Sequence, residues 1–319
     1  MKKIAVALLI ATCALTISPA LAATPAAKVL KVLPAKPFVT TTLSGSAGDQ
    51  LAAMTTTPIS IVAIGTVEST TSTTGTTGGA TDGFIESMDY QGAVQWSLHL
   101  GGAGDEIATA IVKDKAGGYL VVGAASATPT PGPVSSVDTG VVVNPDGVTK
   151  EQINAPTNSL SQLTLWRVST TGQLISNISI SANGVVNPTA IVATATGYLI
   201  TGDLYQGSTK LGFSVAVSST YQLGNLTSAA ETKIAKSGAI TSIKAGTMIY
   251  KSYLSSGAIK GIPSWKPRSE IPVIVGYNKL GAIKSANYLH GKVVSVQWQS
   301  GRGLVILTEQ NDGYGLTLI

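Results

Sequence analysis

The chain has 319 residues, 21 lysines and arginines against 16 acidic residues, and a formal net charge of +5. This length is sufficient for a sizeable core in one or two domains, and charged residues make up only 12% of it, roughly half the usual share. No dense basic run carries interleaved aromatic residues, which disfavours a nucleic-acid partner. Beyond the N-terminus no apolar run approaches the roughly 20 residues of a membrane helix, so no transmembrane segment is predicted.

The first 22 residues are arranged as a secretory signal peptide. Lys2 and Lys3 form a basic start, an apolar run follows from Ile4 to Ile17, and Ala20-Leu21-Ala22 forms a cleavage site. The predicted mature chain begins at Ala23 and is secreted, extracellular or held in the cell envelope. The only cysteine, Cys13, lies within the apolar run, and lipidation of Cys13 is the alternative to simple cleavage. A mature chain without cysteine has no disulfide and no thiol catalysis.

Residues 23–36 are rich in Ala, Pro and Lys and are predicted to be a flexible leader. One β-propeller domain is predicted over residues 37–319. Its first turn, from Gly45 to Gln50, closely matches a later one from Gly101 to Glu106. The stretch from Asp82 to Ser126 contains a complete unit of four short strands separated by Gly- and Asp-rich turns.

Weaker copies of this unit recur along the chain, and five copies account for it at the period of roughly 40–50 residues expected of propeller blades. Each copy contains a strand, a short turn with a glycine and a second strand. The turn glycines are Gly92, Gly172, Gly224 and Gly281.

The unit from Asp82 to Ser126 resembles the repeats of the SBBP family and, more loosely, NHL repeats. The matching residues are Asp82-Gly83-Phe84, Asp89, Gly92, Trp96, Gly101-Gly102, Gly104-Asp105-Glu106, Asp114, Gly118 and Gly123. Both families form β-propellers in secreted or surface-associated proteins, and the resemblance implies blades with strands A to D running from the axis outward.

The predicted fold is therefore all-β, a five-bladed β-propeller of four-stranded antiparallel blades. The ring closes by pairing the N-terminal strand Pro37–Leu43 with the C-terminal strand Gly313–Ile319. The innermost A strands are predicted near Leu51–Thr57, Ile107–Asp114, Pro188–Thr196, Ala239–Ala245 and Val293–Gln299. The C strands are predicted at Gly83–Asp89, Gln162–Ser169, Leu211–Ser218, Ile271–Asn278 and Gly313–Ile319.

Three long inserts, at residues 68–81, 127–161 and 256–270, all lie between the B and C strands of their blades. Because strand directions alternate, these loops emerge on one face together with the Gly-Asp turns between blades. Loops on a rigid scaffold commonly carry function, so this face is the predicted binding face. A small hairpin is predicted around the Asn144-Pro145-Asp146-Gly147 turn.

Candidate binding residues on this face include Asp82 and the turn carboxylates Asp49, Asp105 and Glu106. Carboxylate and carbonyl oxygens suit calcium, but such residues more often bond to the backbone N–H groups of their own turn. We favour the second interpretation and predict no cofactor, with calcium the weaker alternative. His99 and His290 lack the spacing of metal ligands and are predicted to face solvent.

Trp265 and Arg268, in the third insert, complete the candidate binding residues. Trp265 either contacts a ligand or packs on its own domain, and we favour packing. Hydrolysis of glycosides needs paired carboxylates, whereas Asp114 is the one acid in the predicted A strands. The sequence therefore favours a secreted, monomeric, non-enzymatic module that binds a protein or glycan. The alternative is a secreted polysaccharide hydrolase or lyase with a site built from loops at the propeller axis.

Overall fold

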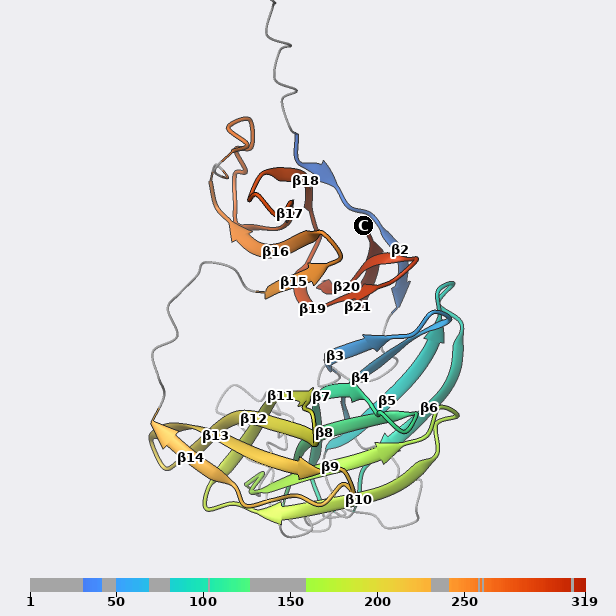
Figure 1. Ribbon diagram of the computed structural model, residues 1–319, viewed down its shortest axis with the longest axis vertical. Helices are drawn as coiled ribbons and strands as arrows, with labels where there is room; N and C mark the ends of the chain where they lie inside the picture. The colour runs from blue at the N-terminus through green and yellow to red at the C-terminus, as the bar shows by residue number, and fades with distance from the viewer. Residues whose placement is uncertain are drawn as a thin grey trace, which may run out of the picture.

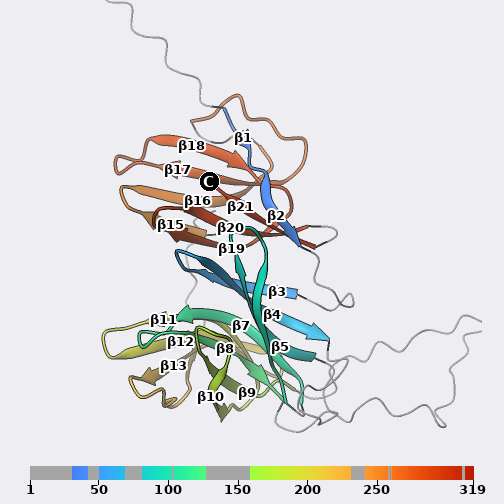
Figure 2. The ribbon, with the colours of Figure 1, turned by 90° about the vertical axis from the view of Figure 1, so that its right-hand side faces the viewer.

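The computed structural model describes residues 31–41, 50–68, 81–102, 104–126, 159–230, 241–257, 259, 261–310 and 313–319. Throughout these ranges the regular elements are strands, and they form five sheets (Figures 1 and 2). The same ranges contain no helix with the length and apolarity that crossing a membrane requires. The predicted signal peptide, Asp49 and the hairpin at Asn144–Gly147 lie outside the described residues.

The first three sheets, which we call blades 1 to 3, are each built from four consecutive strands. Blade 1 consists of β3 (Gln50–Thr56), β4 (Ser60–Glu68), β5 (Thr81–Asp89) and β6 (Val94–Leu100). Blade 2 consists of β7 (Glu106–Lys113), β8 (Tyr119–Ala125), β9 (Gln162–Val168) and β10 (Leu174–Ser181). Blade 3 consists of β11 (Val185–Ala193), β12 (Gly197–Gln206), β13 (Thr209–Ser218) and β14 (Thr227–Ala230).

The last two blades each include a strand from the beginning of the chain. Blade 4 consists of β15 (Thr241–Ala245), β16 (Met248–Ser255), β17 (Ile271–Tyr277), β18 (Ile283–Tyr288) and the short β1 (Leu33–Pro34). Blade 5 consists of β19 (Lys292–Gln299), β20 (Gly303–Gln310), β21 (Gly313–Leu318) and β2 (Pro37–Thr41). The all-β, five-bladed propeller is thus confirmed, with β3, β7, β11, β15 and β19 as the predicted A strands.

The pairing of the two ends of the domain is also confirmed. Strand β2 runs antiparallel to β21, with Pro37 opposite Thr317 and Thr40 opposite Gly315. In Figure 1 the blue β2 lies beside the red strands of the C-terminal blade. Because each strand would otherwise present an unpaired edge, this ladder satisfies backbone groups of both at once.

The predicted leader differs from the structure at its C-terminal end. Leu33 and Pro34 pair in parallel with Asn287 and Tyr288 of β18, and the next residue, Ala35, is only 6% exposed. The Ala35 N–H donates to the Tyr288 carbonyl at 2.9 Å. The prediction of a flexible leader that extends to Lys36 was therefore wrong at its C-terminal end, because Leu33, Pro34 and Ala35 bind to the edge strand β18. Blade 4 consequently has five strands instead of the predicted four.

Hydrophobic packing between neighbouring blades joins them in the order 4, 5, 1, 2, 3. Each contact buries side chains that strand alternation directs toward the adjacent sheet. Representative pairs are Ile274 and Ile306 (blades 4 and 5), Leu316 and Met54 (5 and 1), Ile64 and Trp166 (1 and 2), and Leu120 and Ile200 (2 and 3). Among the described residues no buried cluster spans blades 3 and 4, and their strands lie apart in both Figure 1 and Figure 2.

We predict that removing residues Gly315–Ile319 lowers the melting midpoint by about 10 °C and broadens the transition, because β20 and β2 both lose their partner strand. Calorimetry of the truncated chain measures this. A matched pair of point variants isolates packing: Leu316→Ala, at a side chain 2% exposed, should destabilise far more than Leu318→Ala, at one 37% exposed. Equal effects of the two variants, or an unchanged midpoint after truncation, would contradict the shared blade.

Candidate functional site

Three of the predicted carboxylates come together where blade 1 meets blade 2. Asp82 is the second residue of β5, Asp105 lies in the turn that follows β6, and Glu106 is the first residue of β7. Their exposed fractions are 5%, 0% and 9%, so all three acids are buried on the face that carries the long loops. We call Asp82, Asp105 and Glu106 the carboxylate cluster.

Glycines bring the turn backbone close to these acids. A Cβ atom added to Gly101 would collide with Oδ1 of Asp82, which only a residue without a side chain avoids. Asp82 also lies near His99, whose Nδ1 is 3.8 Å from Asp82 Oδ2. His99 and His290 are both exposed, as predicted.

Glu106 is bonded to its own turn, because the Gly102 N–H donates to Glu106 Oε2 at 3.2 Å. Burial raises the pKa of Glu106 from 4.5 to about 7, the Gly102 bond opposes this rise, and the charges of Asp82 and Asp105 add to it. The backbone bond fits the favoured interpretation of the carboxylates as turn-shaping groups. The raised pKa also leaves Glu106 partly protonated near neutral pH.

Asp105 fixes the same turn through its backbone. Its N–H donates to the Ser126 hydroxyl at 2.9 Å, and its carbonyl accepts the Ser126 N–H at 2.8 Å. In the described part of the chain, no group of three or more His, Cys, Asp or Glu residues could hold a metal ion.

Trp265 and Arg268 lie on blade 4, away from the carboxylate cluster in sequence and in blade. The Trp265 Nε1 donates to the Ser255 hydroxyl at 3.1 Å, and its ring stacks on Tyr288 at 5.6 Å between centroids. Trp265 therefore packs on its own blade, which confirms the favoured interpretation. Arg268 is exposed.

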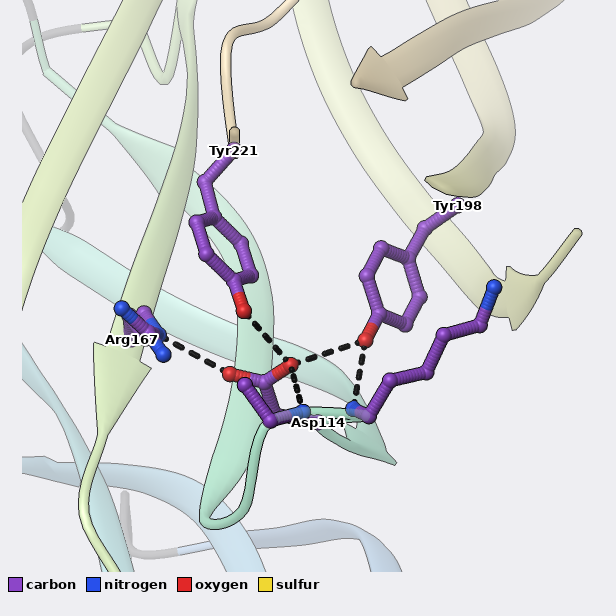
Figure 3. Close-up of polar contacts among 6 residues, drawn as sticks. Asp114, Arg167, Tyr198 and Tyr221 are labelled. Carbon is purple, nitrogen blue, oxygen red and sulfur yellow. Dashed lines mark hydrogen bonds and ion pairs between the residues drawn. The ribbon is translucent and has the colours of Figure 1, made fainter. Parts of the chain in front are cut away.

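A second polar cluster lies at the other end of β7, around Asp114 (Figure 3). Asp114 Oδ2 accepts from Arg167 Nε at 2.8 Å. Its Oδ1 accepts from the hydroxyls of Tyr198 and Tyr221, each at 2.9 Å, and from the Ala116 N–H at 3.1 Å. The carboxylate is fully buried and joins blade 2 to β12 and to the turn after β13, both in blade 3.

The assignment of Asp114 to an A strand was wrong. Strand β7 ends at Lys113, and Asp114 opens a turn in which its N–H donates to Gly118 and its carbonyl accepts from Gly117. The acid that does belong to this innermost strand is Glu106, at the opposite end. Among the innermost strands of the described chain, Glu106 is the one acidic residue.

Burial acts to raise the pKa of Asp114, but the hydrogen bonds from Ala116, Arg167, Tyr198 and Tyr221 together hold it below its usual 3.8. An ionised carboxylate that accepts four bonds is strongly stabilised in the folded state. The Asp114 cluster therefore acts as an electrostatic clamp between blades 2 and 3.

Tyr221 has an unusual backbone conformation. Its φ of 65° lies in the left-handed region, where the equivalent turn residues Gly92, Gly172 and Gly281 have φ of 89°, 79° and 76°. The prediction that Gly224 occupies this position in blade 3 was wrong, because the N–H that closes the turn onto Ser218 belongs to Tyr221. A bulky residue in this conformation is strained.

Compensation for this strain comes from the Asp114 cluster itself. The Tyr221 hydroxyl bonds to Asp114, and the Arg167 guanidinium lies 4.0 Å from the Tyr221 ring centroid. Arg167, Tyr198 and Tyr221 were not predicted from the sequence. One signal was available: a tyrosine preceded by glycine lies at the start of β8 and again at the start of β12, and the Tyr119 hydroxyl likewise bonds to Ser60 of the preceding blade.

The similarity of this chain to known proteins is limited to the shape of the fold. No family model and no curated protein matches the chain, so the resemblance to SBBP and NHL repeats stays a prediction. Similar solved structures include a glycoside hydrolase, with 11% identity over 90% of this chain and 91% of that one, at a TM-score of 0.41. BamB from Moraxella catarrhalis is 13% identical over 91% and 96%, at a TM-score of 0.28. The Nup133 β-propeller domain of Vanderwaltozyma polyspora is 11% identical over 82% and 80%, at 0.21. Because these TM-scores are below 0.5, the propeller architecture rests on the sheets themselves.

We predict that Asp114→Asn lowers the free energy of unfolding at pH 7 by about 3–5 kcal/mol, because it leaves Arg167 without its buried partner. Asp203→Asn is the matched control, since it breaks a more exposed pair with Lys210 at 3.3 Å and should cost less than about 1 kcal/mol. Urea titration measures both. Similar losses in the two variants would contradict the clamp.

The depressed pKa of Asp114 also sets a pH dependence. Its stabilisation is present above the unfolded pKa near 3.8 and is lost as the pH falls through the lower folded value. Asp114→Asn should therefore remove part of the loss of stability at acid pH. If the variant and the natural chain lose stability in parallel below pH 4, the carboxylate does not carry this effect.

Glu106 should produce a separate pH dependence of opposite sign. Because its folded pKa is raised from 4.5 to about 7, the folded state binds protons more tightly, and stability falls as the pH rises through this interval. The expected loss is about 3 kcal/mol between pH 4.5 and 8. Glu106→Gln should flatten this part of the stability curve, which denaturant titrations across pH measure; an unaltered curve would show that Glu106 ionises normally.

Proposed function

We propose that the chain is an exported, non-enzymatic β-propeller whose loop-bearing face binds a macromolecular partner, a protein or a glycan. The observation that carries this proposal is the placement of the long connections. Those between β4 and β5, β8 and β9, and β16 and β17 all join the second strand of a blade to the third, and alternating strand directions place them on one face.

The opposite face supports the same assignment by contrast. Its longest connection between described strands runs from Ser219 to Leu226, and the others contain five residues or fewer. Several of these turns are held by side-chain bonds between blades, including the bonds to Asp114 and the Trp96 indole bond to the Thr170 carbonyl at 3.1 Å. A face of short, bonded turns suits a scaffold, whereas long loops suit recognition.

The test is binding of the mature chain to arrays of glycans and extracellular proteins, repeated after shortening the first loop by deleting Thr70–Gly79. Binding should be lost or weakened at least about tenfold while the melting midpoint stays nearly constant. The double substitution Ser219→Ala with Thr220→Ala, on the opposite face, is the control and should leave binding unchanged. Binding that depends on the opposite face and not on the loops would overturn the proposal.

One observation favours a second candidate, a hydrolase or lyase acting on polysaccharides. Glu106 is a buried acid at the loop-bearing end of an innermost strand, with a pKa of about 7 and two further carboxylates nearby. A general acid needs a carboxyl group that still holds its proton near neutral pH. Release of reducing ends from a polysaccharide panel tests this candidate: activity that disappears in Glu106→Gln would establish it, and its absence from the natural chain would remove it.

A further inference from the structure

Blade 4 carries a concentration of positive charge that the chain as a whole does not show. Residues 241–290 contain seven lysines and arginines and a single acidic residue, Glu270. This is a third of the 21 basic residues of the chain and one of its 16 acids. These basic residues are separated in the sequence and form no dense basic run. They come close together only through strand pairing in the sheet.

Strand pairing places two of these cations, Lys244 and Lys251, on one side of the blade. Lys251 of β16 lies opposite Val275 of β17 and Ser242 of β15, and Lys244 lies opposite Ile249. Residues opposite each other on antiparallel strands point to the same face. Lys251 shares its face with Tyr277, because its Nζ lies 5.9 Å from the Tyr277 ring centroid.

Aromatic hydroxyls and rings accompany the cations on this face. The hydroxyls of Tyr253 and Tyr277 lie 3.2 Å apart, and both rings pack beside Val273 and Val275. The third insert folds over the same side: Ile262, fully buried, joins this packing together with Trp265. Lys266 and Arg268 of the same insert are exposed. We call this side of blade 4, with its insert, the cationic face.

The cationic face is the side that strand order directs toward blade 3. Residues of β17 alternate, so that Ile274 packs toward blade 5 whereas Val273 and Val275 point the other way. Within the described chain no buried cluster joins this side to blade 3, and β15–β18 lie apart from β11–β14 in both ribbon views (Figures 1 and 2). Lys244 on this side of the blade and Lys266 and Arg268 in its insert are exposed and can therefore contact a partner.

We propose that the cationic face binds an acidic polysaccharide of the polyuronate type. Such a polymer supplies one carboxylate per sugar for the lysines and arginines, and hydroxyls for Tyr253 and Tyr277. Nucleic acid fits less well, because Trp265 and Tyr288 stack on each other and do not offer the open rings on which bases stack. The third insert belongs both to the cationic face and to the loop-bearing face, so the proposal rests on the function proposed above.

Binding to polygalacturonate, measured by calorimetry at low and high salt, tests this proposal. The double variant Lys266→Gln with Arg268→Gln should weaken binding about tenfold, and added salt should weaken binding by the natural chain. Lys113→Gln with Lys292→Gln removes the same charge from blades 2 and 5 and should change the dissociation constant less than about twofold. A neutral galactan should not bind.

Three results would overturn the proposal: no binding of polygalacturonate, equal weakening by both double variants, or binding of duplex DNA as tightly as polygalacturonate. Its failure is distinguishable from failure of the general binding function. Suppose that polygalacturonate does not bind, but that deleting Thr70–Gly79 abolishes binding of another ligand. The general binding function is then supported and the polyuronate assignment is contradicted. If no ligand responds to any loop variant, both fall.

Discussion

The propeller depends on the backbone ladder between β2 and β21, which lets the two ends of the domain share one blade. Its contribution extends beyond the two strands. Val39 of β2 lies against Gly92 in a turn of blade 1, as Trp96 of β6 lies against Gly172 in the equivalent turn of blade 2. The Tyr314 hydroxyl of β21 also accepts the Leu51 N–H at 2.9 Å. The shared blade therefore makes the same kind of contact with its neighbour as a blade of consecutive strands does.

Strand β7 places one buried acid at each of its ends, Glu106 on the loop-bearing face and Asp114 on the face with short turns. Asp114, next to its last residue, is buried with a donor for each oxygen, and its pKa is lowered. Glu106, its first residue, is buried beside two other carboxylates, and its pKa is raised. Both carboxyl groups are buried, but only Asp114 is hydrogen-bonded to a cation and to tyrosine hydroxyls. The ionised Asp114 thus stabilises the face with short turns, whereas ionisation of Glu106 on the loop-bearing face destabilises the fold near neutral pH.

Strand order and blade count could be predicted from the sequence because they depend on local signals. Turns such as Gly101–Glu106 recur, and apolar alternation between them marks strands of fixed length. The Asp114 cluster could not be predicted in this way, because its partners Arg167, Tyr198 and Tyr221 lie 53, 84 and 107 residues away. Local rules also failed at Tyr221, where glycine preference pointed to Gly224. At Tyr221 the hydrogen bond to Asp114, a residue far away in the sequence, compensates for a backbone conformation that is unfavourable for tyrosine.

The leader and the carboxylates show a similar limit. Composition suggested a flexible segment up to Lys36, but the free edge of β18 pairs with Leu33 and Pro34, which no local pattern reveals. Asp82, Asp105 and Glu106 were recognised from their turns, whereas their mutual proximity follows from how blade 1 meets blade 2. The cations of blade 4 likewise form a common surface only once the strand register places Lys244 and Lys251 on one side.

Hydrogen exchange of the β2 amides under native conditions tests the shared blade most directly. If β2 is an integral strand of blade 5, its paired amides exchange only through global unfolding, at rates set by the same free energy as those of β20. Exchange of the β2 amides on the timescale of a fraying terminus, while β20 stays protected, would show that the N-terminal strand does not hold the propeller together.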